Sequence, residues 1–246
     1  MLTNIHQMLA LPKFYRFTGK LLPYLFVLTA GLFCYGIFGA LFLAPADYQQ
    51  GEGFRIIYVH VPSAYCSLAI YSIMAVAALL TVVWRIKLAA MIMKACLPIG
   101  ALFTLLALIT GSIWGKPMWG TWWIWDARLT SELILLLWYL VVMGFQQTVS
   151  NQHNANLLAA ILVLIGVVNL PIIHFSVIWW NTLHQGPTLT RFAMPAIDPQ
   201  MLRPLLVMIA ASSSYCLLIL VLKLRSEILW QERNKQWVRE SIGDCI

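Results

Sequence analysis

The sequence predicts an all-α polytopic membrane protein with six transmembrane helices and both termini in the cytoplasm. Three observations predict this fold. Hydrophobic residues make up 61% of the 246 residues and charged residues only 10%, whereas soluble domains have about 45–50% apolar and about 25% charged residues. Uncharged stretches long enough to cross a bilayer recur along the chain, and lysine and arginine gather in alternate connecting segments. This composition excludes an ordinary soluble domain and a disordered chain.

Gaps between charged residues define the helices in order, because a helix that crosses the hydrocarbon core needs about 20 mostly apolar residues. No Asp, Glu, Lys or Arg occurs strictly between residues 20 and 47, 55 and 85, 94 and 116, 132 and 191, or 203 and 223. The fourth gap accommodates two helices, separated by a polar stretch from Gln146 to Asn156. The predicted spans, all in a single membrane domain of residues 1–246, are 21–43, 57–84, 95–114, 131–147, 157–177 and 204–223.

The distribution of basic residues predicts the orientation. Segments on the side of both termini carry eleven Lys and Arg: Lys13, Arg16, Lys20, Arg85, Lys87, Lys94, Lys223, Arg225, Arg233, Lys235 and Arg239. The opposite side carries five: Arg55, Lys116, Arg128, Arg191 and Arg203. Cytoplasmic loops carry the excess of basic residues, so both termini are predicted in the cytoplasm. The formal net charge of +7 suits an anionic membrane surface. Membrane lipids are therefore expected as partners, and nucleic acid is not, because no basic-aromatic motif is present.

Several motifs of membrane enzymes and pumps are missing. No pair among the five cysteines has C-x-x-C spacing, and four of them fall inside predicted spans. All five are therefore predicted to be small buried side chains, which argues against a thiol–disulfide oxidoreductase. The segment G-S-I-W-G-K-P at residues 111–117 lacks the spacing and the Ser/Thr of a P-loop, so no ATPase activity is predicted. The span centres lack carboxylates and lysines, which argues against an ion-coupled carrier.

A tryptophan-rich segment, residues 114–130, lies between the third and fourth predicted spans. Five of the eleven tryptophans occur within it: Trp114, Trp119, Trp122, Trp123 and Trp125. An interfacial belt, which is the alternative interpretation, spreads its aromatic residues over many helix ends, whereas these crowd one loop. Pro117 is predicted to begin a short interfacial helix, on which Trp119, Trp122, Trp123 and Asp126 share one face. Because flat rings stack on flat conjugated ligands, the segment predicts a ligand platform.

Two histidines flank this platform on the same side of the membrane. His60 precedes Val61-Pro62 at the predicted start of the second span, and His184 lies beyond the fifth span, before a Gln185-Gly186-Pro187 helix stop. Neutral imidazoles are good axial ligands for haem iron. The combination predicts one planar, partly apolar ligand that contains a metal. His174, near the outer end of the fifth span, is a reserve candidate for a ligand or for a residue that orients one.

The charged residues near the platform have less specific interpretations. Lys116, Arg128 and Arg55 could pair with haem propionates, although Arg55 is better explained by topology and headgroup contact. Asp126 either caps the fourth helix or orients Arg128 or a ligand histidine. Glu132 is expected to pair with Arg128, four residues earlier on the same helix.

The segment W-G-T-W-W-I-W-D at residues 119–126 resembles the W-G-x-x-W-x-W-D signature, called WWD, of haem-handling proteins in cytochrome c biogenesis. The length and the six predicted spans resemble the haem exporter protein C (CcmC) family of system I cytochrome c maturation. That resemblance implies that haem b, iron protoporphyrin IX, binds at the periplasmic face of the bacterial inner membrane. It implies His60 and His184 as the axial ligands and the tryptophan-rich segment as the platform.

The same resemblance implies the partners and the kind of activity. Haem would pass to the haem chaperone CcmE, and the chain would work with CcmD and the ABC transporter subunits CcmA and CcmB. The chain itself would bind and deliver haem without catalytic residues. Two other functions stay open on the residues alone. One is a permease for haem or another amphipathic solute, which would need a polar path through the bundle. The other is a haem-containing oxidoreductase subunit, which would need ligands within the bundle.

Overall fold

Six helical segments in a computed structural model are long and apolar enough to cross a membrane. The structure describes residues 10–180, 182–184, 186 and 197–243, and this part of the chain contains no β-strand. The segments are Leu11–Leu43, Glu52–Trp84, Lys87–Trp119, Ala127–Thr148, Gln152–Trp179 and Pro199–Glu232. The predicted all-α fold with six spans is therefore confirmed. Each of these six segments is longer than its predicted span, because flanking charged and polar residues continue the helical structure beyond the apolar stretch.

Most elements follow one another with short connections, and the longest stretch, residues 180–198, lies between α7 and α8. In chain order they are α2 (Leu11–Phe38), the π-helical turn η1 (Gly39–Leu43), the 3₁₀ turn η2 (Glu52–Ile56), α3 (Ile57–Trp84), α4 (Lys87–Trp119), α5 (Ala127–Thr148), α6 (Gln152–Gly166), α7 (Asn169–Trp179), α8 (Pro199–Glu232) and α9 (Gln236–Gly243). Short polar side chains cap three helix starts by accepting backbone hydrogen bonds: Asp126 for α5, Asn151 for α6 and Asp198 for α8. Helix ends are also set by single residues. Helix α4 stops after Trp119 because Gly120 adopts a left-handed backbone conformation with φ 77°.

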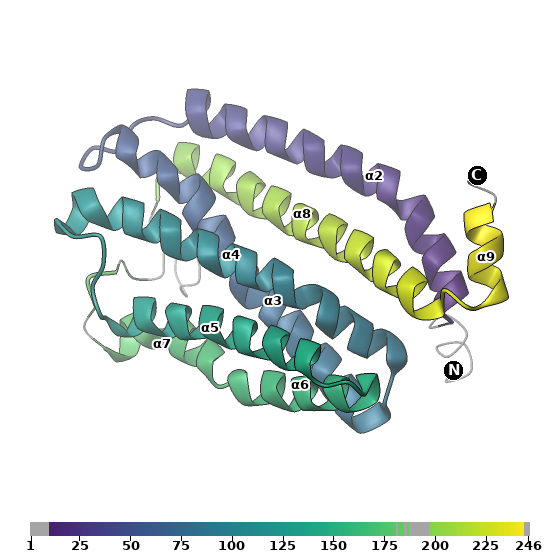
Figure 1. The fold of residues 1–246 in the computed structure, drawn as a ribbon. Helices are drawn as coiled ribbons and strands as arrows, with labels where there is room; N and C mark the ends of the chain where they lie inside the picture. Colours follow the sequence, from purple (N-terminus) through teal and green to yellow (C-terminus); the bar gives the residue numbers. More distant parts are fainter. Residues whose placement is uncertain (1–9, 181, 185, 187–196, 244–246) are drawn as a thin grey trace.

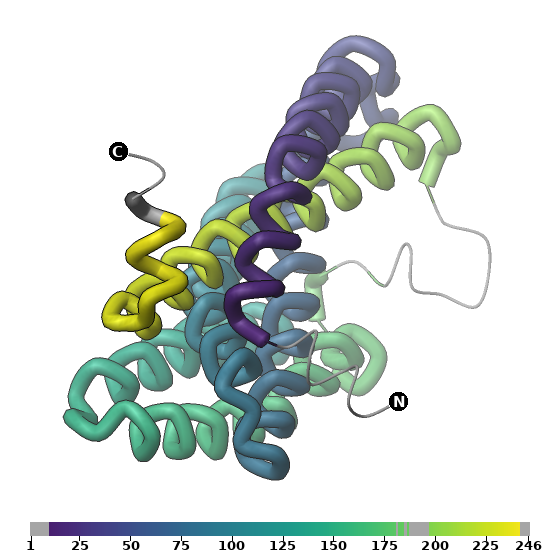
Figure 2. The backbone as a smooth tube through the Cα atoms, turned by 90° about the vertical axis from the view of Figure 1, so that its right-hand side faces the viewer, coloured from purple at the N-terminus to yellow at the C-terminus, as the bar shows by residue number. Residues whose placement is uncertain are grey.

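The helices form a layered bundle (Figures 1 and 2). Helix α2 lies on the outside and packs chiefly on α8. Helix α8 packs in turn on α3 and α4, and α5, α6 and α7 cover the other side of that central pair. Helix α2 begins and α8 ends at the same end of the bundle, which we call the terminal end (Figure 1). The opposite end is where α4 ends and α5 begins.

Buried tyrosines connect the central helices. Tyr139 of α5 and Tyr71 of α3 are fully buried, and each hydroxyl donates a hydrogen bond to a backbone carbonyl of another helix. Gly100 of α4 admits the Tyr139 ring, because a Cβ at that position would overlap the phenol. Satisfied hydroxyls and close packing of this kind hold α3 and α4 in one fixed arrangement. The site described below is built on that pair.

The fifth predicted span is two helices rather than one. The break between α6 and α7 follows Gly166, which is packed tightly against Tyr71 and Trp138, and precedes Pro171, which cannot donate to the carbonyl four residues earlier. The Asn169 side chain donates to the carbonyl of Ser131 on α5 at 2.9 Å and so stabilises the break. As a result α7 follows α5 toward the end opposite the termini, where the chain continues to residues 182–184.

Buried cysteines are only partly as predicted. Cys66, Cys96 and Cys216 are buried in the helical core, but Cys34 is exposed on α2, so its predicted burial is wrong. The reason is that α2 packs mainly through α8, which leaves much of the α2 surface open. Cys245 lies outside the described residues.

Candidate functional site

A cavity of about 190 Å³ opens between α3, α4, α5 and residues 183–184, at the end of the bundle opposite the terminal end. Its walls are mostly apolar and come from the central helices. Five residues predicted to hold the ligand line it: His60, His184, Trp114, Trp119 and Arg128. The other five predicted residues, Trp122, Trp123, Trp125, Asp126 and Lys116, belong to the same segment but lie outside the cavity lining. The structure therefore brings both histidines and two indoles together at one place.

The two imidazole rings face one space. The ring centroids of His60 and His184 are 6.2 Å apart, and the ring planes are inclined by 38°. Two imidazoles on opposite sides of one metal ion, each with a metal–nitrogen bond of about 2 Å, would have centroids about 6 Å apart. His60 and His184 would be the residues that hold a metal ion in this cavity, each through an imidazole nitrogen.

Backbone and side-chain groups of α4 orient His60. Its Nδ1 atom lies 3.1 Å from the carbonyl of Ala107 and 3.1 Å from Oγ1 of Thr110. The Thr110 hydroxyl itself donates to the carbonyl of Leu106 at 2.6 Å, so both groups act as acceptors toward Nδ1. This network assigns the proton to Nδ1 and leaves the lone pair on Nε2. A metal-ligating histidine is oriented in the same way, by a hydrogen bond from its other nitrogen.

Two indoles border the imidazoles. Trp114 contacts His60 edge to face, with ring centroids 5.7 Å apart, and its Nε1 donates to the Gln50 side chain at 2.7 Å. Trp119 lies beside His184, with centroids 6.4 Å apart. The ring of Trp119 folds back over Gly115, where an added Cβ would lie 2.8 Å from it. Flat aromatic walls of this kind suit a flat conjugated ligand.

The remaining tryptophans lie on an irregular loop of residues 120–126. Trp122 and Trp125 are 57% and 76% exposed, and Lys116 lies over the Trp122 ring at 6.0 Å. The indole nitrogen of Trp123 is buried and has no hydrogen-bond partner in the described part of the chain. Trp122 and Trp125 therefore form an exposed aromatic surface on the loop that follows α4.

The predicted short interfacial helix that begins at Pro117 is wrong. Helix α4 continues through Pro117 to Trp119, and residues 120–126 are not helical. The physical reason is that a proline near a helix end removes only one hydrogen bond, while Gly120 in the left-handed region stops the helix. Asp126 then caps α5, with Oδ1 accepting from the backbone N–H of Leu129 at 2.8 Å. Its second oxygen, Oδ2, is buried and has no partner among the described residues.

Glu132 and Arg128, two polar residues that line the cavity, have partners other than the predicted ones. Glu132 is 8% exposed, and its carboxylate accepts a hydrogen bond from Ser67 of α3 at 2.8 Å. In the described residues it forms no ion pair with Arg128 within 4 Å, so the predicted pairing is wrong. Arg128 instead donates to the carbonyl of Ile173 on α7 at 3.3 Å. Sequence reasoning missed Ser67, since a lone serine in an apolar helix gives no signal of its own.

Arg55 and His174 lie away from the cavity lining. The Arg55 guanidinium forms hydrogen bonds with Glu52 and with the carbonyl of Ala40, which ties η2 to η1. The His174 ring packs edge to face on Phe175, with centroids 4.8 Å apart. His174 is therefore not among the described residues that line the cavity, although its neighbour Ile173 is.

Comparison with known proteins identifies relatives over nearly the whole chain. The family profile described as "CcmC: Heme exporter protein C" matches residues 4–239. Heme exporter protein C of Escherichia coli strain K12 is 47% identical over 239 residues, which cover 97% of this chain and 96% of that protein. The protein of the same name from Haemophilus influenzae is 49% identical and covers 92% of each chain. A putative cytochrome c biosynthesis ccmC-like mitochondrial protein of Marchantia polymorpha is 43% identical, covering 87% of this chain and 90% of that protein. The chain belongs to the CcmC family, haem exporter protein C.

Proposed function

We propose that this membrane protein binds haem b at the periplasmic face of the bacterial inner membrane and presents it to the haem chaperone CcmE during cytochrome c maturation. Membership of the haem exporter protein C family supports a role in haem handling for cytochrome c maturation. The single observation that carries the proposal for the site is the 6.2 Å separation of the His60 and His184 rings across an apolar cavity.

The residues of the cavity fit haem chemically. His60 offers a neutral imidazole whose free nitrogen is Nε2, and His184 provides a second ring on the other side of the same space. Trp114 and Trp119 provide flat apolar surface, and Arg128 provides a guanidinium that can bind a propionate. The haem is cargo here, so these residues bind and orient it and take no part in a covalent step.

Transfer to a second protein requires that one side of the cargo stays accessible. The cavity opens at the end of the bundle rather than inside it, and the exposed Trp122 and Trp125 lie on the loop beside it. A protein acceptor can dock on such an aromatic surface, because tryptophans are enriched at the centres of interfaces. We therefore assign cavity binding to Trp114 and Trp119, and contact with CcmE to the exposed tryptophans.

The proposed orientation rests on the excess of basic residues toward the terminal end, eleven against five. A C-terminal fusion to a fluorescent protein that folds only in the cytoplasm is expected to fluoresce, and a C-terminal fusion to a phosphatase that is active only in the periplasm is expected to be inactive. The reverse pattern would place the cavity on the cytoplasmic side and contradict the proposal.

Further partners follow from the family. We propose that the chain assembles with CcmD and with the ABC transporter subunits CcmA and CcmB. A requirement for CcmA and CcmB agrees with the absence of a P-loop in this chain, because any ATP-driven step must then come from another subunit.

Replacement of Trp119 by alanine is expected to reduce haem delivery to CcmE about tenfold or more, because the indole beside His184 is lost from the cavity wall. Delivery is measured as haem bound covalently to CcmE in cells that express equal amounts of each variant.

Asp126→Asn keeps an N-cap side chain and removes the charge, and we expect it to impair delivery as well. Trp179→Ala is the matched control, since Trp179 is exposed at the end of α7 and outside the cavity lining. An equal loss of haem delivery in Trp119→Ala and Trp179→Ala would support an interfacial belt of aromatic residues instead of a haem platform.

A further inference from the structure

A second cavity, of about 350 Å³, lies toward the terminal end of the bundle, between α4, α5 and α8. Its polar lining residues are Lys94 on α4, Gln146 and Gln147 on α5, and Lys223, Ser226 and Glu227 on α8. Pro98 also lines it, and a proline there removes the helical hydrogen bond to the carbonyl of Lys94. This cavity is separate from the one that contains the histidines and shares no lining residue with it.

The cavity presents hydrogen-bond donors that have no protein partner. The side-chain nitrogen of Gln146 is buried and has no hydrogen bond in the described part of the chain. Lys223, Ser226 and Gln147 are exposed and have no side-chain partner within the described residues. A buried amide without a partner costs about 1–3 kcal/mol, which a bound acceptor would recover. Three kinds of donor, an ammonium, a hydroxyl and amides, therefore belong to residues that line one cavity.

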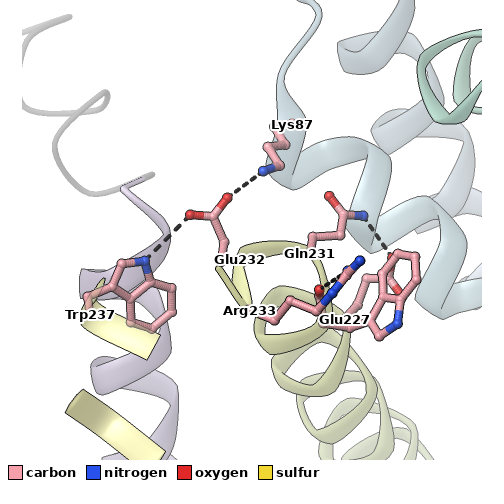
Figure 3. Close-up of polar contacts among 7 residues, drawn as sticks. Lys87, Glu227, Gln231, Glu232, Arg233 and Trp237 are labelled. Carbon is pink, nitrogen blue, oxygen red and sulfur yellow. Dashed lines mark hydrogen bonds and ion pairs between the residues drawn. The ribbon is translucent and has the colours of Figure 1, made fainter. Parts of the chain in front are cut away.

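Among the described residues that line the cavity, the one carboxylate is already paired. The Glu227 carboxylate accepts from Lys94 Nζ at 2.8 Å and from Gln231 Nε2 at 2.7 Å. Figure 3 shows the contact between Gln231 and Glu227 near the end of α8, beside the separate contact between Lys87 and Glu232. With Lys94 and Glu227 neutralising each other, Lys223 leaves the cavity with a net positive charge. An anion is the ligand that this charge favours.

The position of the cavity in the predicted membrane is that of lipid headgroups. Lys223 is the first charged residue after the apolar stretch 204–222 of α8, and Gln146 is the first amide after the apolar part of α5. On the membrane side of these polar residues, Phe145 and Leu222 are 47% and 44% exposed. A ligand bound here would therefore have its anionic group in the cavity and an apolar part against exposed helix surface.

We propose that this cavity binds the headgroup of an anionic phospholipid of the phosphatidylglycerol type. The phosphate accepts from Lys223 and from the amide of Gln146, the glycerol hydroxyls reach Ser226 and Gln147, and the acyl chains lie on α5 and α8. A positive cavity at the membrane surface selects this lipid over a zwitterionic one, because each basic residue near an anionic surface contributes about 1 kcal/mol.

Native mass spectrometry of the full-length protein, purified in detergent and mixed with defined lipids, tests the proposal. We expect phosphatidylglycerol to be retained about fivefold more than phosphatidylcholine, and Lys223→Gln to remove that preference. Gln146→Leu, which removes the buried amide, is expected to weaken retention of phosphatidylglycerol as well. Lys20→Gln is the matched control, because Lys20 is an exposed lysine of α2 toward the same end and outside the cavity lining.

Other outcomes overturn the proposal. Equal retention of the two lipids, or an equal effect of Lys20→Gln and Lys223→Gln, would show that the cavity is not selective for the anionic headgroup. Displacement of the lipid by millimolar inorganic phosphate would identify free phosphate as the ligand. The haem spectrum of Lys223→Gln is expected to equal that of the unmodified protein, so the result is independent of the proposed haem function.

Discussion

Alanine at either His60 or His184 is expected to abolish or strongly shift the haem Soret band of the purified protein. Each substitution removes one of two rings that are 6.2 Å apart across the cavity. Loss of a group that merely orients a metal ligand costs about 10–100-fold in affinity, so loss of the ligand itself should exceed that range. The measurement is an absorption spectrum of each variant in detergent, with haem added at a known ratio, compared with the unmodified protein.

His174→Ala is the matched control. His174 lies on α7, ten residues before His184, but its ring packs on Phe175 and does not line the cavity. Its spectrum should match that of the unmodified protein. Added imidazole should restore the band in His60→Ala, since a small ligand can occupy the space left by the ring and a misfolded protein cannot be rescued in this way. Unchanged spectra in both His60→Ala and His184→Ala would remove the ligand assignment.

Leucine at Gly111 is expected to block haem binding while leaving the helices in place. Gly111 lines the cavity on α4, and a Cβ added there would lie 3.0 Å from Cε1 of His60. The rest of a leucine side chain must then occupy the cavity itself or push the imidazole from its hydrogen bonds with Ala107 and Thr110. We expect a loss of haem affinity of at least about tenfold, measured by titration of the purified protein with haem.

Gly144→Leu on α5 controls for the effect of a glycine-to-leucine change in a membrane helix. A Cβ at Gly144 meets no heavy atom within 4 Å, so the added side chain is directed into open space. This variant should bind haem normally and unfold at a temperature no lower than the unmodified protein, because leucine has the higher helix propensity. If Gly111→Leu binds haem as well as Gly144→Leu does, the ligand does not occupy this cavity.

The membrane fold could be predicted from the sequence because charge and hydropathy alone place a helix in a bilayer. The meeting of His60 and His184 could also be predicted, as both follow from the order of the spans and the ends at which they terminate. The loop around Trp122 could not, because helical spacing of tryptophans does not reveal where a helix stops. There the local signals of Gly120 and Asp126 prevail over the periodic pattern.

The other features that the sequence did not predict depend on tertiary contacts. The partner of Glu132 is a serine 65 positions earlier in the chain, and no local pattern indicates such a distant pair. At the break between α6 and α7, Pro171 is a local signal, but the close approach of Tyr71 and Trp138 to Gly166 cannot be read from the order of residues. A hydrophobic stretch predicts that a helix crosses the membrane. Whether that helix is continuous or broken depends also on the residues that pack against it.

The two histidines differ in how they are supported. His60 belongs to α3 and is tethered to α4 by two hydrogen bonds, whereas His184 belongs to a non-helical stretch after α7. Moving the His60 ring therefore requires its Nδ1 to leave both groups on α4. We therefore expect the α3–α4 side of the cavity to keep its shape when a flat ligand binds or is released.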